Sequence, residues 1–138
     1  MTGLHLADKS ALEQRRHSTA ARDLLALLLV EGALASCHVT ALEVLYSARN
    51  RQDYETLRSD IATLPWLPTD QRAMDRALEV QGLLARRGQH RVPLPDLMIA
   101  ATAEVNDAVV LHYDHDFDVI AAVTGQPTRW IVKRGTGG

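Results

Sequence analysis

Short apolar runs alternate with longer amphipathic segments along the whole chain, a pattern that predicts strands alternating with helices. The runs that predict buried strands lie at residues 4–8, 35–39, 108–113 and 128–132. The segments with helical spacing lie at residues 9–32, 40–50, 53–64, 69–88, 96–105 and 117–125. We therefore expect a three-layer α/β domain, in which right-handed crossovers place helices on both faces of a central, mostly parallel sheet.

Local signals define several helix ends. The helix over 69–88 is predicted to end at Gly88 with Arg86 and Arg87 in its last turn, where cations interact favourably with the helix dipole. Pro95 and Asp96 mark the start of the next helix. The apolar run from residue 24 to residue 30, in DLLALLLVE, is much shorter than the roughly 20 residues that cross a bilayer. We expect it to form a buried helix face and predict no membrane span.

Composition is typical of one globular domain. The chain has 138 residues, of which 46% are hydrophobic, so we predict a single domain over 1–138 with a flexible tail from about 134 to 138. Fifteen Lys and Arg residues face 17 Asp and Glu residues, and the net charge of -2 gives no global basic field for nucleic acid. With Cys37 as its single cysteine and no signal-peptide pattern at MTGLHLADKS, the chain is expected to be cytoplasmic.

Acidic side chains follow the predicted strands. The stretch LHYDHDFD, residues 111–118, places three carboxylates within five residues behind an apolar run. Asp8 and Asp114 close two predicted strands, while Glu43 and Asp96 lie at the starts of two helices that border the same edge of the sheet. Four carboxylates at one edge repel one another unless a cation compensates. Carboxylate oxygens with open water positions suit Mg²⁺ or Mn²⁺, so we expect a metal site there.

Each acid also has a structural explanation. Glu43 lies three residues after Thr40, which is the spacing of a capping box. Asp96, Asp114 and Asp116 could each favour a helix N-terminus. The pair His112 and His115 around Asp114 resembles two zinc ligands, but the chain has no second cysteine to complete a zinc site, and we expect these histidines to flank the acidic site instead.

Four segments together resemble the PIN-domain ribonucleases, and above all the VapC-type toxins of VapBC toxin–antitoxin systems. These segments are LADKSAL, TALEVLYSA, RVPLPDLMIAATA and VVLHYDHDFDVIA, and they span nearly the whole chain. The most specific feature is PDLMIAATA followed about a dozen residues later by LHYDHDF. The resemblance implies a PIN-like fold and an acidic site whose members are Asp8, Glu43, Asp96 and Asp114, with Asp116 as a fifth acid and Ser10 supporting Asp8.

The resemblance also implies an activity and partners. The chain would be a Mg²⁺-dependent endoribonuclease, with Mn²⁺ as a possible substitute, that cleaves cellular RNA with metal-activated water. Asp8, Asp96 and Asp114 would hold the ion, and Glu43 would orient the water or a second ion. The expected partners are a second copy of the chain and a VapB-like antitoxin, whose arginine would pair with Asp96 or Asp114.

Two positions depart from the family pattern. Lys9 and His112 stand where many members have threonine. Lys9 could compete with a metal for the carboxylates or contact a phosphate, and the sequence leaves both open. Most arginines are expected to solvate helix faces, but Arg91 lies in the loop before Asp96 and is the preferred phosphate contact.

The sequence leaves two alternatives to the nuclease. A catalytically inactive PIN-fold module would bind RNA or protein and keep its acids for stability, with Lys9 replacing the charge of the metal. A phosphoacceptor domain is less favoured, because it needs an acid at the end of a central strand and a lysine on a late strand. The PWLPT segment supplies no such acid, and Lys133 falls near the end of the chain.

Overall fold

The computed structural model describes residues 3–135, and its centre is a four-stranded parallel sheet with the order β2-β1-β3-β4. The strands are β1 (His5–Ala7), β2 (Leu34–Ala35), β3 (Val109–His112) and β4 (Thr128–Trp130). All neighbouring strands pair in parallel, so their carboxyl ends lie at one edge of the sheet. This topology confirms the predicted α/β fold class.

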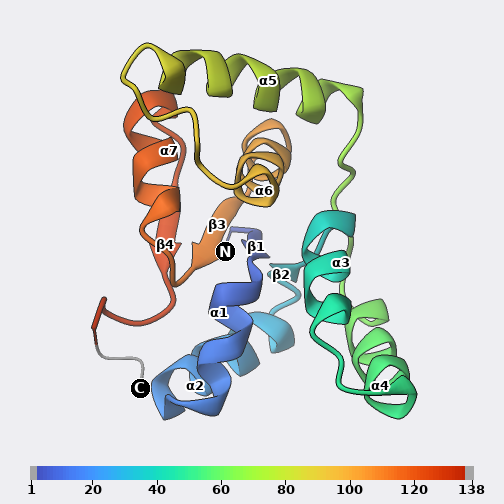
Figure 1. Ribbon diagram of the computed structural model, residues 1–138. Helices are drawn as coiled ribbons and strands as arrows, with labels where there is room; N and C mark the ends of the chain where they lie inside the picture. Colours follow the sequence, from blue (N-terminus) through green and yellow to red (C-terminus); the bar gives the residue numbers. More distant parts are fainter. Residues whose placement is uncertain (1–2, 136–138) are drawn as a thin grey trace.

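Helices cover both faces of this sheet. They are α1 (Lys9–Glu13), a 3-10 turn η1 (Gln14–Arg16), α2 (Thr19–Val30), α3 (His38–Tyr46), α4 (Arg51–Ala62), α5 (Gln71–Ala85), α6 (Leu94–Val105) and α7 (Asp116–Thr124). Figure 1 shows α5 lying across α6 and α7 on one side of the molecule, α1 and α2 on the opposite side, and α3 and α4 beyond β2. The three layers are therefore those expected from the alternation of apolar runs and helical segments.

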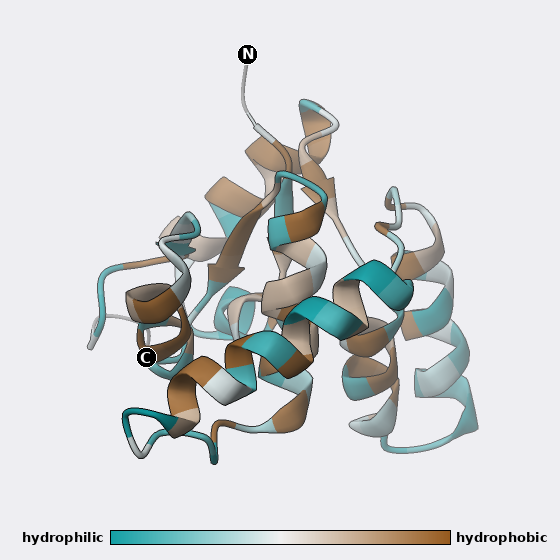
Figure 2. Cartoon of the chain, turned by 90° about the horizontal axis from the view of Figure 1, so that it is seen from above, coloured by the Kyte–Doolittle hydropathy of each residue, from teal (hydrophilic) through white to brown (hydrophobic). Residues whose placement is uncertain are grey.

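The central strands separate two hydrophobic cores. Leu6 and Val110 are partners in the β1–β3 ladder and are buried with residues of α5, α6 and α7. The next pair, Ala7 and Leu111, is buried on the other face with residues of α2. Successive side chains of a strand point to opposite faces, so short runs buried on both faces are apolar throughout. Figure 2 accordingly shows the strands mostly brown and several helices with both brown and teal residues.

Two predicted element boundaries are wrong. The single helix over 9–32 is interrupted near Ser18, whose hydroxyl accepts the N–H of Ala21 at 3.1 Å and starts α2 as a new helix. The predicted strand over 35–39 ends at Ala35, and Cys37 is already the N-cap of α3. Serine competes for backbone hydrogen bonds and favours caps over helix interiors, which explains the first break.

The prediction that Thr40 and Glu43 form a capping box is also wrong. Thr40 lies inside α3, whose first residue is His38, and its buried hydroxyl donates a 3.1 Å hydrogen bond to the carbonyl oxygen of Ala7. Thr40 therefore connects α3 to the end of β1. Glu43 is left without the structural role that its spacing from Thr40 indicated.

The apolar run in α2 is only partly buried. Leu25 and Leu28 belong to the core, but Leu27, Leu29 and Val30 are 53%, 52% and 86% exposed. The prediction of a buried face is therefore wrong for these three residues. Within residues 3–135, no helix combines the length and the apolar character that a bilayer span requires.

The end of the chain is only partly described. Residues 136–138 of the predicted tail lie outside the described part of the chain. The N–H of Gly135 donates a 3.0 Å hydrogen bond to the Tyr113 hydroxyl. The flexible tail stays a prediction.

Candidate metal centre

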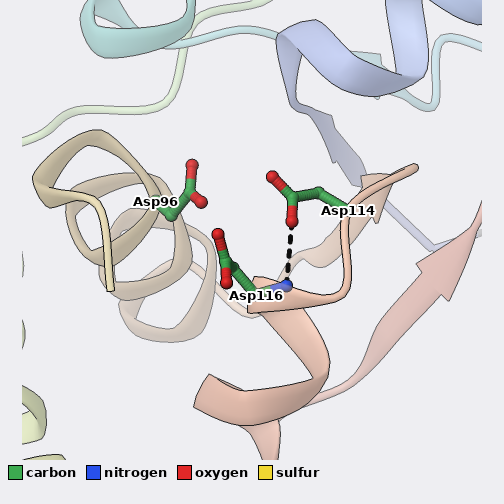
Figure 3. Close-up of side chains that lie close together, drawn as sticks. All are labelled: Asp96, Asp114 and Asp116. Atoms are coloured by element: carbon green, nitrogen blue, oxygen red, sulfur yellow. Dashed lines mark hydrogen bonds between the residues drawn. The ribbon is translucent and has the colours of Figure 1, made fainter. Parts of the chain in front are cut away.

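Three carboxylates meet beyond the carboxyl end of β3. One oxygen from each of Asp96, Asp114 and Asp116 lies within 4.8 Å of the other two. Figure 3 shows Asp96 projecting from α6 toward Asp114, which follows β3, and Asp116, which begins α7. Two oxygens on opposite sides of one Mg²⁺ are about 4.1 Å apart, twice the usual Mg–O distance. Small side-chain rotations would therefore bring the three oxygens onto a single ion.

Hydrogen bonds fix the backbone of the turn that carries two of these acids. The N–H of Tyr113 donates to Ser10 Oγ at 2.9 Å, and the N–H of Asp114 donates to His112 Nδ1 at 3.2 Å. The N–H of Asp116 donates to Asp114 Oδ1 at 2.9 Å. The N–H groups of Tyr113, Asp114 and Asp116 thus all have side-chain acceptors. These hydrogen bonds restrain the backbone that carries Asp114 and Asp116.

Asp8 reaches the same edge from the end of β1. Its N–H donates to the carbonyl oxygen of Leu111 in β3 at 2.9 Å, and its side chain caps α1. Ser10 donates to Asp8 Oδ2 twice, from its N–H at 3.0 Å and from its hydroxyl at 2.6 Å. Ser10 is therefore placed beside Asp8, where the resemblance requires it.

Glu43 approaches the site from the middle of α3. Its Oε1 is buried and has no hydrogen-bond partner. Burial, followed by the negative charge of Asp8, raises the pKa of Glu43 above its ordinary value. Asp114 raises this pKa as well, so Glu43 belongs to the same electrostatic environment as the acids at the ends of β1 and β3.

Asp96 experiences the strongest electrostatic effect. Burial raises its pKa to about 8, and the charges of four neighbouring acids act in the same direction; these are Asp8, Asp114, Asp116 and Glu43. Burial is also the leading cause of the raised pKa values of Asp8 and Asp116. The five predicted acids therefore lie in one electrostatic environment, in which their mutual repulsion is only partly offset, for example by the charge of Lys9 acting on Glu43.

The donor set of this site fits a divalent cation. Asp8 Oδ1, Glu43 Oε1 and Asp96 Oδ2 are all buried and have no hydrogen-bond partner. Buried polar atoms are normally paired, and hard carboxylate oxygens are the preferred ligands of Mg²⁺ and Mn²⁺. Within the described chain, Asp96, Asp114 and Asp116 form the group with metal-ligand spacing, while Asp8 and Glu43 lie outside that group.

The histidines do not form a zinc site. His112 is completely buried, burial lowers its pKa to about 4, and its ring packs between Phe117 and Trp130. The Nδ1 atom of the exposed His115 lies 3.3 Å from Asp118 Oδ2. In the part of the chain that the structure describes, the group with metal-ligand spacing contains carboxylates and no histidine.

The two basic candidates differ in how they relate to the acids. Lys9 Nζ lies 3.4 Å from Glu13 Oε1, one turn along the chain in α1, and its charge also acts on Glu43, where it opposes the rise in pKa. Arg91 is exposed in the loop between α5 and α6. Lys9 thus forms its ion pair with Glu13, while the phosphate contact of Arg91 stays a prediction.

The parallel α/β fold and the five acids near the carboxyl edge of its sheet define the class of protein, an α/β domain with an acidic site. Comparison with known proteins identifies the family. Residues 10–123 match the family model of the PIN domain. The chain is 46% identical over 140 residues to Ribonuclease VapC21 of Mycobacterium tuberculosis, an alignment that covers 99% of each protein. It is 44% identical over 132 residues to Ribonuclease VapC51 of the same species, with 96% of each covered. The chain therefore belongs to the PIN-domain family, among the VapC-type proteins.

Solved structures agree with the fold. The VapBC complex of Salmonella typhimurium bound to DNA contains a chain that superposes with a TM-score of 0.76 at 20% identity, over 95% of this chain and 100% of that one. VapBC-1 of nontypeable Haemophilus influenzae gives a TM-score of 0.71 at 17% identity, over 94% and 99% of the two chains. At these identities the likeness shows the fold.

Proposed function

We propose that this protein is a metal-dependent endoribonuclease of the VapC type, which acts on cellular RNA in the cytoplasm. The observation that carries the proposal is the convergence of five acids with three buried, unpaired oxygens at one edge of the sheet. Relatives that share 46% and 44% of its sequence are named ribonucleases, which supports RNA as the substrate.

Asp96, Asp114 and Asp116 would hold Mg²⁺, and Asp8, which lies outside the group with metal-ligand spacing, would join them through its buried, unpaired Oδ1. Mn²⁺ suits the same oxygens. When bound, such an ion supplies a nucleophile at neutral pH and stabilises the charge that develops on phosphorus during in-line displacement. Glu43 would orient the attacking water with its unpaired Oε1. Because hydrolysis by a positioned water needs no nucleophilic side chain, we expect no covalent intermediate.

The acids alone would repel an RNA backbone, so the cation is needed for substrate approach as well as for chemistry. Because the net charge of the chain is -2, attraction for RNA phosphates must come from individual basic side chains. The exposed Arg91, in the loop that leads to α6 and Asp96, would contact an RNA phosphate. An Arg91→Ala variant should therefore bind RNA more weakly while it retains its affinity for Mn²⁺.

A VapB-like antitoxin and a second copy of the chain are the proposed partners. The superposed chains belong to structures titled VapBC, and exposed apolar side chains such as Leu27, Val30, Leu42 and Tyr46 offer surface for protein contacts. An antitoxin arginine that pairs with Asp96 or Asp114 would exclude the metal by direct competition. A co-purified complex whose antitoxin lies far from these acids would contradict this mode of inhibition.

The first test is cleavage of a mixed RNA pool by purified protein freed of antitoxin. Reactions would contain Mg²⁺, EDTA, or EDTA followed by excess Mg²⁺, with Asp96→Asn in parallel and Asp75→Asn as a matched variant of an exposed acid on α5. We expect products only when Mg²⁺ is present, from the wild type and Asp75→Asn alone. Products that persist in EDTA and in Asp96→Asn would refute the proposal.

The alternative of an inactive binding module requires Lys9 to replace the charge of the metal. Lys9 forms its ion pair with Glu13, and its charge also acts on Glu43. Three unpaired carboxylate oxygens remain in the site. A bound cation explains these oxygens, which favours the metal-dependent nuclease.

A further inference from the structure

His112 contacts the backbone of a proposed metal ligand. Its Nδ1 accepts the N–H of Asp114 at 3.2 Å. Because Nδ1 is the acceptor, the ring is neutral and carries its proton at Nε2. His112 is 0% exposed, so the acceptor side of this part-buried hydrogen bond is out of reach of solvent.

The ring of His112 is held by two different elements. Its centroid lies 5.1 Å from the ring of Phe117 in α7 and 4.9 Å from the ring of Trp130 in β4. Trp130 is fixed in turn, because its Nε1 donates to both carboxylate oxygens of Asp118 at 3.2 and 3.3 Å. Packing from α7 and β4 therefore determines where Nδ1 lies.

The position of Nδ1 in turn fixes the position of the Asp114 backbone N–H, which donates to it. Asp114 Oδ1 accepts the N–H of Asp116, and the carbonyl oxygen of Asp114 accepts the N–H of Phe117 at 3.2 Å. A shift of the Asp114 backbone would thus move both acids of the turn relative to Asp96. Residues that orient metal ligands in this way typically change metal affinity 10- to 100-fold when they are replaced.

We propose that His112 is a positioning residue, which holds Asp114 and Asp116 in register with Asp96 through the hydrogen bond from the Asp114 N–H to Nδ1. This inference rests on the proposed function, because it assumes that the three acids bind a cation. His112 stands where the family resemblance leads one to expect threonine, whose hydroxyl can accept an N–H two residues further along the chain. The imidazole supplies this acceptor and adds the packing of an aromatic ring.

Two variants distinguish the role of His112 as a hydrogen-bond acceptor from the role of its aromatic ring in packing. His112→Phe keeps an aromatic ring between Phe117 and Trp130 but removes the acceptor. His112→Asn removes the ring but can place its amide oxygen near the position of Nδ1. Each variant would be measured for melting temperature without metal, amide hydrogen exchange of Asp114, and Mn²⁺ affinity by calorimetry, with RNA cleavage as a last step.

We expect the two variants to differ in metal binding and not simply in stability. His112→Phe should bind Mn²⁺ at least about tenfold more weakly and exchange the Asp114 amide about tenfold faster. His112→Asn should melt at a lower temperature, because it leaves a cavity, but keep its Mn²⁺ affinity within about threefold. Wild-type affinity in His112→Phe, or affinity losses in both variants that follow their melting temperatures, would overturn the inference.

The experiment also separates this inference from the proposed function. If the wild type binds no Mn²⁺ and cleaves no RNA, the proposed function fails and the positioning role fails with it. If the wild type binds Mn²⁺ and cleaves RNA while His112→Phe does both equally well, only the role of His112 is refuted.

Discussion

Ser10 holds one oxygen of Asp8 with two hydrogen bonds, 3.0 Å from its N–H and 2.6 Å from its hydroxyl, and Asp8 leaves its other oxygen buried without a partner. The same hydroxyl accepts the N–H of Tyr113, 103 residues further along the chain. Ser10 thus links the two strand ends that carry the predicted acids, and it orients the unpaired oxygen of Asp8.

Ser10→Ala should weaken both the fold and the site. The variant loses the hydroxyl bonds to Asp8 and to the Tyr113 N–H, so we expect the free energy of unfolding to fall by about 1–2 kcal/mol. Mn²⁺ affinity should fall about tenfold, because Asp8 is no longer oriented. Denaturant unfolding and calorimetry would measure these changes, with Ser59→Ala on exposed α4 as the control. Equal losses in the control would contradict the prediction.

Asp96 should make the metal-free protein less stable as the pH rises. Its pKa is raised to about 8, so the folded state holds a proton that the unfolded state releases near pH 4. Stability falls with pH wherever the folded state binds more protons, which for Asp96 is the range from about pH 4 to about pH 8. Mn²⁺ would remove this loss by displacing the proton.

Asp96→Asn should accordingly stabilise the metal-free protein at pH 8. We expect its melting temperature to exceed that of the wild type by about 5 °C at pH 8, and this difference to shrink toward pH 4. Thermal unfolding in EDTA at several pH values measures it. A variant that melts below the wild type across the whole range would show that the carboxyl of Asp96 is structural.

Glu43→Gln should impair cleavage more than metal binding. Glu43 keeps a buried, unpaired oxygen but lies outside the group of acids with metal-ligand spacing. We expect the cleavage rate at saturating Mg²⁺ to fall about 100-fold, within the range that a positioned general base contributes, while Mn²⁺ affinity changes less than tenfold. Glu55→Gln on α4 is the control. Loss of Mn²⁺ binding in parallel with activity would make Glu43 a metal ligand instead.

Lys9→Ala should be nearly neutral. Lys9 forms a partly exposed ion pair with Glu13, and such pairs contribute little to stability. We expect the free energy of unfolding to change by less than about 0.5 kcal/mol and RNA cleavage to remain dependent on Mg²⁺. A large destabilisation that added Mg²⁺ reverses would show that Lys9 replaces the cation, as the inactive-module alternative requires.

The order of the elements and the placement of the acids at one edge of the sheet follow from local patterns in the sequence. Short apolar runs and helical spacing are local patterns, and parallel strands must end at the same edge of a sheet, so Asp8 and Asp114 could be placed together before the fold was known. Glu43 and Asp96 could be added from their positions at the predicted starts of helices that border this edge, and the family resemblance added Asp116 and Ser10. The structure brings all five acids into one electrostatic environment.

Contacts between distant segments of the folded chain override several local signals. Thr40 has the spacing of a cap to Glu43, but it lies inside α3 because its hydroxyl bonds to Ala7, 33 residues away. His112 looked like a zinc ligand, but the rings of Phe117 and Trp130 bury it and direct its Nδ1 to a backbone N–H. These outcomes depend on contacts between segments distant in sequence, because burial and hydrogen-bond partners are properties of the packed chain and no local pattern encodes them.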